Sequence, residues 1–127
     1  MELNEVTGQI VDAAIKVHSA LGPGLLESAY EACLMHELIK RGLRVQAQVP
    51  LPVNYDGLQL EVGYRIDLLV ADAVIVELKA VEQLNPIHEA QLLSYLRLAN
   101  RPLGLLINFN VLHLKDGVKR MINKTRP

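Results

Sequence analysis

The stretch YRIDLLVADAVIVELKA, residues 64–80, decides how we expect this chain to fold. It joins two strand-like segments, residues 58–70 and 74–81, through a short Ala-Asp-Ala turn, which favours an antiparallel pair. If the turn is centred on Asp72, Asp67 lies opposite Glu77, because each is five residues from that centre. Lys79 follows Glu77 by two positions and therefore points to the same face of the strand.

The Glu-Leu-Lys tripeptide alone is a weak signal, since Glu and Lys commonly occupy the wet face of an exposed strand. Here its flanks are apolar, so the strand should be largely buried, and buried charges need partners. The facing carboxylates of Asp67 and Glu77 repel each other unless a cation or a shared proton lies between them. A hard divalent cation is the simplest solution, although a register shift of one residue would separate the two side chains.

The sequence before this stretch is helical in pattern. Apolar residues recur every three or four positions over residues 3–21, and Gly22-Pro23-Gly24 ends that helix. A second helix is predicted over residues 25–41, with Gly42 just after its C-cap. A strand-like segment at residues 43–53 then completes a three-stranded meander with the pair described above.

After the meander, Asn85-Pro86 predicts the start of a helix that continues over residues 87–99. The next strand is predicted over residues 103–109, and the continuous apolar run at residues 103–107 is typical of a strand covered on both faces. A short strand around residues 111–114 and a polar tail should finish the chain. The order α(α)βββαβ(β) describes an α/β sandwich, and residues 1–127 have the size of one domain.

Two helices carry polar residues in suggestive places. His88, Gln91 and Tyr95 share one helix face, and a polar edge with a half-buried tyrosine explains them equally well. Glu27 and Tyr30 follow Gly24 in the second helix, where a helix-dipole partner and a core residue are sufficient explanations. The apolar face of the later helix is expected to comprise Ile87, Ala90, Leu93 and Leu96.

Taken together, these motifs resemble the GxxExxY family within the PD-(D/E)XK nuclease superfamily. GLLESAYE, YRIDLLV, VIVELKA and HEAQLLSYLRL occur in the same order as in that family. The resemblance implies a restriction-endonuclease-like sandwich, in which helices flank a central mixed sheet. It also implies metal-dependent hydrolysis of phosphodiester bonds, with Mg²⁺ or Mn²⁺ as the cofactor and nucleic acid, DNA rather than RNA, as the substrate.

The resemblance further assigns roles to particular residues. The metal ligands would be Asp67, Glu77 and the main-chain carbonyl of Leu78, with Glu27 as a further candidate. Lys79 would orient the attacking water and stabilise the developing charge. The remaining helix residues would contact the substrate. Gln91 and Tyr95 would position the phosphate, and His88 would contact the nucleic-acid strand or the leaving group.

Composition limits how nucleic acid could be held. Thirteen basic and fourteen acidic side chains give a net charge of -1, which argues against binding by bulk charge. Four Tyr, one Phe and no Trp make stacking platforms scarce. Backbone contacts would therefore be local, and the candidates are Arg41, Arg44, Arg97, Arg101, Lys119, Arg120, Lys124 and Arg126.

Other expectations concern the surroundings of the protein. The lone Cys33 fits a reducing compartment, and no leader or membrane-spanning run is recognisable, so we expect a cytoplasmic protein without a membrane. A homodimer is compatible with the many apolar residues, but no pattern specifies one.

Two rival hypotheses stay open. In the first, a nuclease fold without catalysis binds nucleic acid or protein. In the second, Glu77 and Lys79 form only a satisfied sheet contact, which predicts that the protein binds no metal and that a Glu77→Leu, Lys79→Met double variant loses little of its fold.

Overall fold

The computed structural model describes residues 1–124 and contains one five-stranded sheet, one two-stranded hairpin and three α-helices within that range. The helices are α1 (Leu3–Leu21), α2 (Glu27–Lys40) and α3 (Pro86–Ala99). The strands are β1 (Val45–Pro50), β2 (Val53–Tyr55), β3 (Leu58–Leu60), β4 (Arg65–Val70), β5 (Val74–Lys79), β6 (Leu103–Asn108) and β7 (Val118–Ile122). None of the helices in residues 1–124 is long and apolar enough to cross a membrane.

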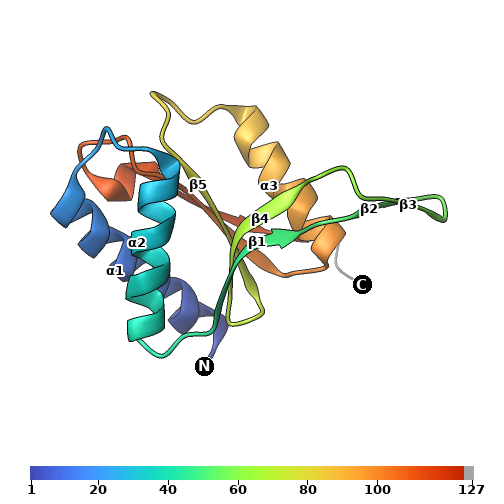
Figure 1. Ribbon diagram of the computed structural model, residues 1–127, viewed down its shortest axis with the longest axis horizontal. Helices are drawn as coiled ribbons and strands as arrows, with labels where there is room; N and C mark the ends of the chain where they lie inside the picture. Colours follow the sequence, from blue (N-terminus) through green and yellow to red (C-terminus); the bar gives the residue numbers. More distant parts are fainter. Residues whose placement is uncertain (125–127) are drawn as a thin grey trace.

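The main sheet has the strand order β1-β4-β5-β6-β7, and only the β5–β6 pair is parallel. Helix α3 provides the crossover between those two strands, as a parallel connection requires. Helices α1 and α2 lie together on one side of the sheet, and α3 lies on the other (Figure 1). The fold is therefore the expected α/β sandwich with a mixed sheet between helices.

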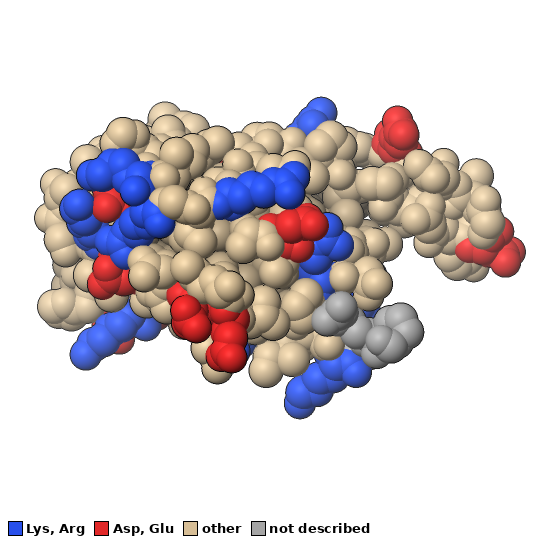
Figure 2. Space-filling view, turned by 90° about the horizontal axis from the view of Figure 1, so that it is seen from below, with Lys and Arg blue, Asp and Glu red and all other residues tan. Residues whose placement is uncertain are grey.

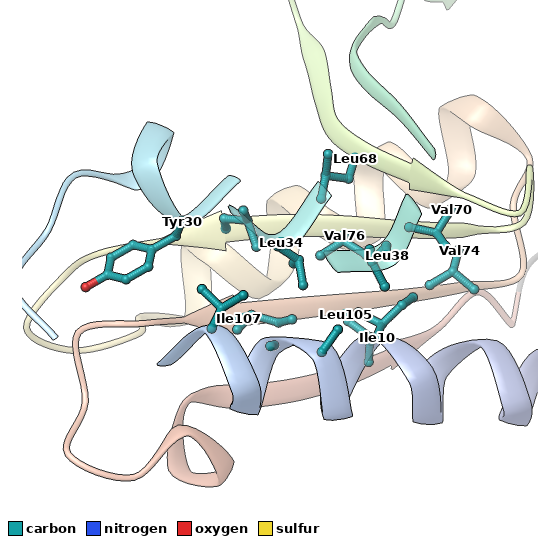
Figure 3. Packing of buried hydrophobic residues seen from close by; sticks show 14 of the residues in the cluster. Ile10, Tyr30, Leu34, Leu38, Leu68, Val70, Val74, Val76, Leu105 and Ile107 are labelled. Carbon is teal, nitrogen blue, oxygen red and sulfur yellow. The ribbon is translucent and has the colours of Figure 1, made fainter. Parts of the chain in front are cut away.

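Two apolar clusters hold these layers together. The larger cluster packs α1 and α2 against one sheet face, with Ile10, Leu34 and Val76 fully buried (Figure 3). The smaller cluster packs α3 against the other face through Leu92, Tyr95 and Leu96. Strand β6 is buried along its whole length, which confirms the expectation from its continuous apolar run.

Gly104 explains how closely α3 approaches the sheet. A Cβ atom on Gly104 would lie 2.9 Å from Cδ1 of Leu92, closer than side-chain carbons normally come. Because Gly104 has no side chain, α3 can pack closely against β6, the neighbour of β5 in the sheet. This contact fixes the distance between the residues of α3 and those of β5.

Three expectations about local structure are wrong. The last strand is not at residues 111–114 but at Val118–Ile122, after a 3-10 turn at Leu114–Gly117, so Lys119 and Arg120 belong to β7 and not to a tail. Arg126 lies outside the described residues. The apolar face of α3 is also different, because Ile87 is 70% exposed and the tyrosine is buried with the leucines.

The third difference concerns the expected long strands. The segments at residues 43–53 and 58–70 each divide in two, and their outer parts pair as a separate hairpin, β2–β3. Asp56 and Gly57 form its turn, both with positive φ, a conformation that suits tight hairpins. We call β2–β3 and the residues up to Tyr64 the arm; it projects away from the main sheet (Figure 1).

Candidate active site

The centre of the candidate site is the point at which β4 and β5 stop pairing. Their ladder follows the register expected for a turn around Asp72, and its last pair is Leu68 with Val76. Beyond it, the backbone N–H of Asp67 donates a hydrogen bond to Oε2 of Glu77 at 2.8 Å. The N–H of Leu78 donates to Oδ2 of Asp67 at 2.9 Å. Each carboxylate is thus held by the opposite strand where the two strands diverge.

Glu77 is unusual for a charged residue, because only 5% of it is exposed. Burial, followed by the negative charge of Asp67, raises the pKa of the Glu77 carboxyl to about 8, whereas the Lys79 ammonium lowers it. A carboxyl group with this pKa carries a proton for much of the time at neutral pH. A positive charge beside it would oppose that shift and favour the ionised carboxylate.

A pocket of ≈ 220 Å³ opens beside Asp67 and Leu78, between the sheet and the start of α2. Glu27, which begins α2, lines this pocket as expected, and Glu31 lies one helical turn further along. Burial raises the pKa of Glu31, and the charges of Asp67 and Glu27 add to that effect. The pocket is therefore strongly acidic.

Gln48 is a part of this pocket that was not predicted. Its side-chain amide donates to Oε1 of Glu31 at 2.6 Å and to Oδ1 of Asp67 at 3.4 Å. Its backbone has φ of 52°, which is uncommon for a residue other than glycine and often marks a functional position. Nothing in the sequence singles out Gln48, whereas Glu31 could have been found because it follows Glu27 by four residues on the same helix.

The two motif residues of α3 lie on the other side of Glu77. Gln91 Nε2 donates to the Tyr95 hydroxyl at 3.3 Å. Burial raises the pKa of Tyr95, and the negative charge of Glu77 contributes next. Tyr95 packs in the apolar cluster of Ile75, on the sheet face that carries Glu77, and Gln91 is hydrogen-bonded to Tyr95. His88 caps the start of its own helix, because its Nδ1 accepts a hydrogen bond from the N–H of Asn85 at the N-terminus of α3.

Lys79 sits at the end of β5, and the backbone that follows it is clamped. Asn108 is 2% exposed, and its side chain accepts from the N–H of Val81 at 3.1 Å and donates to its carbonyl at 2.9 Å. The Lys79 carbonyl accepts a hydrogen bond from the N–H of Phe109. Asn108 is a second residue that was missed, although an asparagine ending a continuous apolar run was a usable signal.

Gly24 and Tyr30 shape the loop that delivers Glu27 to the pocket. Tyr30 is completely buried and stacks on Phe109 with ring centroids 4.4 Å apart. Its hydroxyl donates to the Gly22 carbonyl at 2.6 Å and accepts from the N–H of Leu25 at 3.1 Å. Gly24 has φ of 97°, a conformation that favours glycine. Both residues therefore act on the loop before α2.

We expect Tyr30→Phe to lower the free energy of unfolding by about 1–2 kcal/mol, because the Gly22 carbonyl and the Leu25 N–H both lose their hydroxyl partner while the ring stays in place. Urea unfolding of the purified protein measures this loss. Tyr55→Phe is the matched control, because Tyr55 is 73% exposed and its hydroxyl should contribute little. An unchanged midpoint in Tyr30→Phe would contradict the role of the hydroxyl.

The donor set fits a divalent cation in part. No three His, Cys, Asp or Glu side chains in residues 1–124 converge closely enough to hold a metal ion, so the acidic residues of α2 do not complete a protein-only ligand set. Two carboxylates remain, Asp67 and Glu77, beside the backbone of Leu78. Mg²⁺ commonly takes one or two carboxylates and keeps several waters. Such an ion would stabilise the ionised forms of the buried Glu77 and the half-buried Asp67, which repel each other when both are charged.

The predicted basic contacts do not gather around this pocket. Arg41 is bound to Asp12 at 2.7 Å, Arg101 to Asp72 at 2.9 Å and Arg120 to Asn4 at 2.8 Å. On the face shown in Figure 2, acidic groups separate the basic ones, and the left part, which α1 and α2 form in Figure 1, carries both signs. Basic residues on this face therefore form no continuous surface.

A mixed sheet between helices, with paired carboxylates where two antiparallel strands part and a lysine two residues on, defines a nuclease-like α/β class. The chain belongs to the PD-(D/E)XK nuclease superfamily, whose family model matches residues 4–121. This superfamily consists of nucleases that generally depend on a divalent metal and act on nucleic acid. No curated protein and no solved structure matched the chain.

Proposed function

We propose that this chain hydrolyses phosphodiester bonds of nucleic acid, DNA rather than RNA, with Mg²⁺ or Mn²⁺ held by Asp67, Glu77 and the main-chain carbonyl of Leu78. The observation that carries the proposal is the burial of Glu77 against Asp67, with its pKa raised to about 8 and with Lys79 beside it. Such perturbed groups concentrate at functional sites.

The roles of the other residues follow from their positions. A cation bound at the carboxylates would supply the positive charge that polarises the phosphate and makes a nearby water more acidic. Lys79 would orient that water and stabilise negative charge that develops on the phosphate. Tyr95 and Gln91, which are hydrogen-bonded to each other, would hold the phosphate from the side of α3, and His88 would contact the neighbouring nucleotide.

We further propose that residues 1–127 form one nuclease domain of the GxxExxY family, because Gly24, Glu27 and Tyr30 carry that signature. Glu27 lines the pocket of Asp67, and it would act on the cation through water. The free Cys33 favours the cytoplasm as the place of action.

Calorimetric titration with Mg²⁺ and Mn²⁺ tests the site without a choice of substrate. We expect saturable binding by the wild type, loss of binding in Glu77→Ala, and unchanged binding in Glu61→Ala, an exposed carboxylate on the arm. The wild type should also cleave DNA when the same ions are present. A folded wild type that binds neither ion and cleaves neither DNA nor RNA would overturn the proposal.

The alternative is a module that keeps the fold and binds nucleic acid or protein without cleavage. One observation favours it: within residues 1–124 no cluster of three metal-ligating side chains is present. This alternative predicts nucleic-acid binding that is equally strong in chelator and in Glu77→Ala. The nuclease hypothesis predicts cleavage that chelator abolishes, so the two give opposite results in one assay.

A further inference from the structure

A second cavity lies between the arm and α3, on the side of Glu77 away from the acidic pocket. It has a volume of ≈ 540 Å³ and is lined by Val53 and Tyr64 from the arm, and by Ile87, Gln91 and Tyr95 among others from α3. This size suits a small organic group. Tyr95 lines the cavity and packs in the same apolar cluster as Ile75, which shares one face of β5 with Glu77. The cavity therefore lies on the side of the sheet that carries Glu77.

The aromatic surface of this cavity is open to solvent. Tyr64 is 46% exposed and makes a tilted contact with Tyr95, with ring centroids 6.1 Å apart and an interplanar angle of 59°. Ile87, at the start of α3, is 70% exposed. Exposed apolar surface that is concentrated beside a pocket commonly marks a binding site, and an uncovered tyrosine ring is a platform for stacking.

Polar groups in the same cavity suit the edge of a nucleobase. Nδ1 of His88 accepts the hydrogen bond from Asn85, so a neutral imidazole carries its proton on Nε2 and can donate from there. Gln91 contributes a side-chain amide and Ser94 a hydroxyl. One flat aromatic platform, apolar walls and a few donors and acceptors form the combination by which proteins recognise unstacked bases.

Charge on this surface contributes little attraction to a phosphate backbone. The arm carries acidic groups on an otherwise uncharged surface in Figure 2, and Arg41, Arg101 and Arg120 are engaged in contacts within the chain. Attraction to the phosphate backbone is therefore limited. Affinity for nucleic acid would have to come mainly from stacking of bases on the exposed aromatic ring.

We propose that the cavity between the arm and α3 binds an unpaired nucleobase by stacking on Tyr64, next to the phosphodiester that lies at Asp67 and Glu77. The inference rests on the proposed function for the position of that phosphodiester. It adds a substrate class: strands with unpaired bases, such as single strands, flaps and frayed ends. Uniform duplex is disfavoured because its base faces are already covered by their neighbours.

Binding of a short single-stranded oligonucleotide that carries one 2-aminopurine tests this inference in EDTA, where no cleavage occurs. We expect the wild type to bind the single strand more tightly than the matched duplex and to quench the 2-aminopurine fluorescence on stacking. Tyr64→Ala should weaken binding by roughly ten-fold and remove the quenching, the loss expected when one base has no aromatic partner. Tyr64→Phe should keep both properties.

Tyr55→Ala is the matched control, because Tyr55 lies on the same arm, is 73% exposed and does not line the cavity. Its binding and quenching should equal those of the wild type. The inference is overturned if the wild type binds no single strand, if Tyr64→Ala binds and quenches as the wild type does, or if Tyr55→Ala loses as much. DNA and RNA versions of the oligonucleotide show which backbone the cavity accepts.

The same measurements separate this inference from the proposed function. A protein that cleaves DNA, but equally fast in wild type and in Tyr64→Ala on single strands, would retain the nuclease function and refute the base-binding cavity. A protein that cleaves nothing, yet shows quenching that depends on Tyr64, would retain the base-binding cavity and refute the nuclease function.

Discussion

Lys79→Ala is expected to slow phosphodiester hydrolysis by roughly 10²- to 10³-fold, the range typical for loss of one charge-stabilising group in an active site. Lys79 interacts with the Glu77 carboxyl and follows it by two residues on the same face of β5. In the proposed function its ammonium would therefore contact the phosphate bound at the carboxylates. Single-turnover rates at saturating Mg²⁺ measure the loss directly.

Metal affinity separates this role from a purely structural one. Removal of a positive charge beside Glu77 should leave Mg²⁺ binding equal or slightly tighter, because like charges repel. Lys115→Ala, which changes an exposed lysine in the 3-10 turn, is the control and should cleave at the wild-type rate. Unchanged hydrolysis in Lys79→Ala would refute the role given to the lysine, whatever its effect on stability.

The second large effect concerns stability in the absence of metal. Folding raises the pKa of Glu77 to about 8, so between the unfolded pKa, near 4.5, and about 8 the folded state holds a proton that the unfolded state has released. The free energy of unfolding therefore decreases as pH rises through this window, by on the order of a few kcal/mol. Below the window this contribution to stability is fully present.

Urea unfolding in EDTA at about pH 5 and about pH 9 measures this slope. Glu77→Gln removes the titrating group, and its stability should change much less with pH than that of the wild type. Glu61→Gln, an exposed glutamate, should retain the wild-type slope. Mg²⁺ should restore stability mainly at the higher pH, where Glu77 can ionise to bind it. Parallel pH profiles for wild type and Glu77→Gln would show that Glu77 is not the responsible group.

The sequence was most informative where one local pattern was enough. The helix at residues 3–21 has the predicted bounds, because an unbroken apolar spacing and a Gly-Pro-Gly end define it locally. The pairing of β4 with β5 was predictable for the same reason, since a short turn between two apolar runs leaves few registers. Asp67 and Glu77 are therefore neighbours as expected.

The misses all depend on contacts between distant parts of the chain. Residues 111–113 bend and residues 114–117 form a 3-10 turn, whereas a strand was expected around residues 111–114. A Cβ atom on Gly117 would lie 2.2 Å from the backbone oxygen of Asn108, so the turn depends on a close approach that local sequence does not show. Ile87 looks like a core residue in a helical pattern, but it lies at the start of α3 and lines the cavity beside the arm, where it is 70% exposed. Gln48 lines the acidic pocket with a backbone φ of 52°, a conformation that residue propensities do not predict for glutamine.

The bonds of Tyr30 also bear on how this sequence could evolve. Its hydroxyl joins Gly22 to Leu25 and its ring supports Phe109, so selection for folding alone would preserve it. A descendant that lost Glu77 and Lys79, and with them any catalysis, would still be expected to retain Gly24 and Tyr30. Genome surveys for active enzymes of this kind should therefore weight the acidic pair and the lysine, since the glycine and the tyrosine would also persist in inactive descendants.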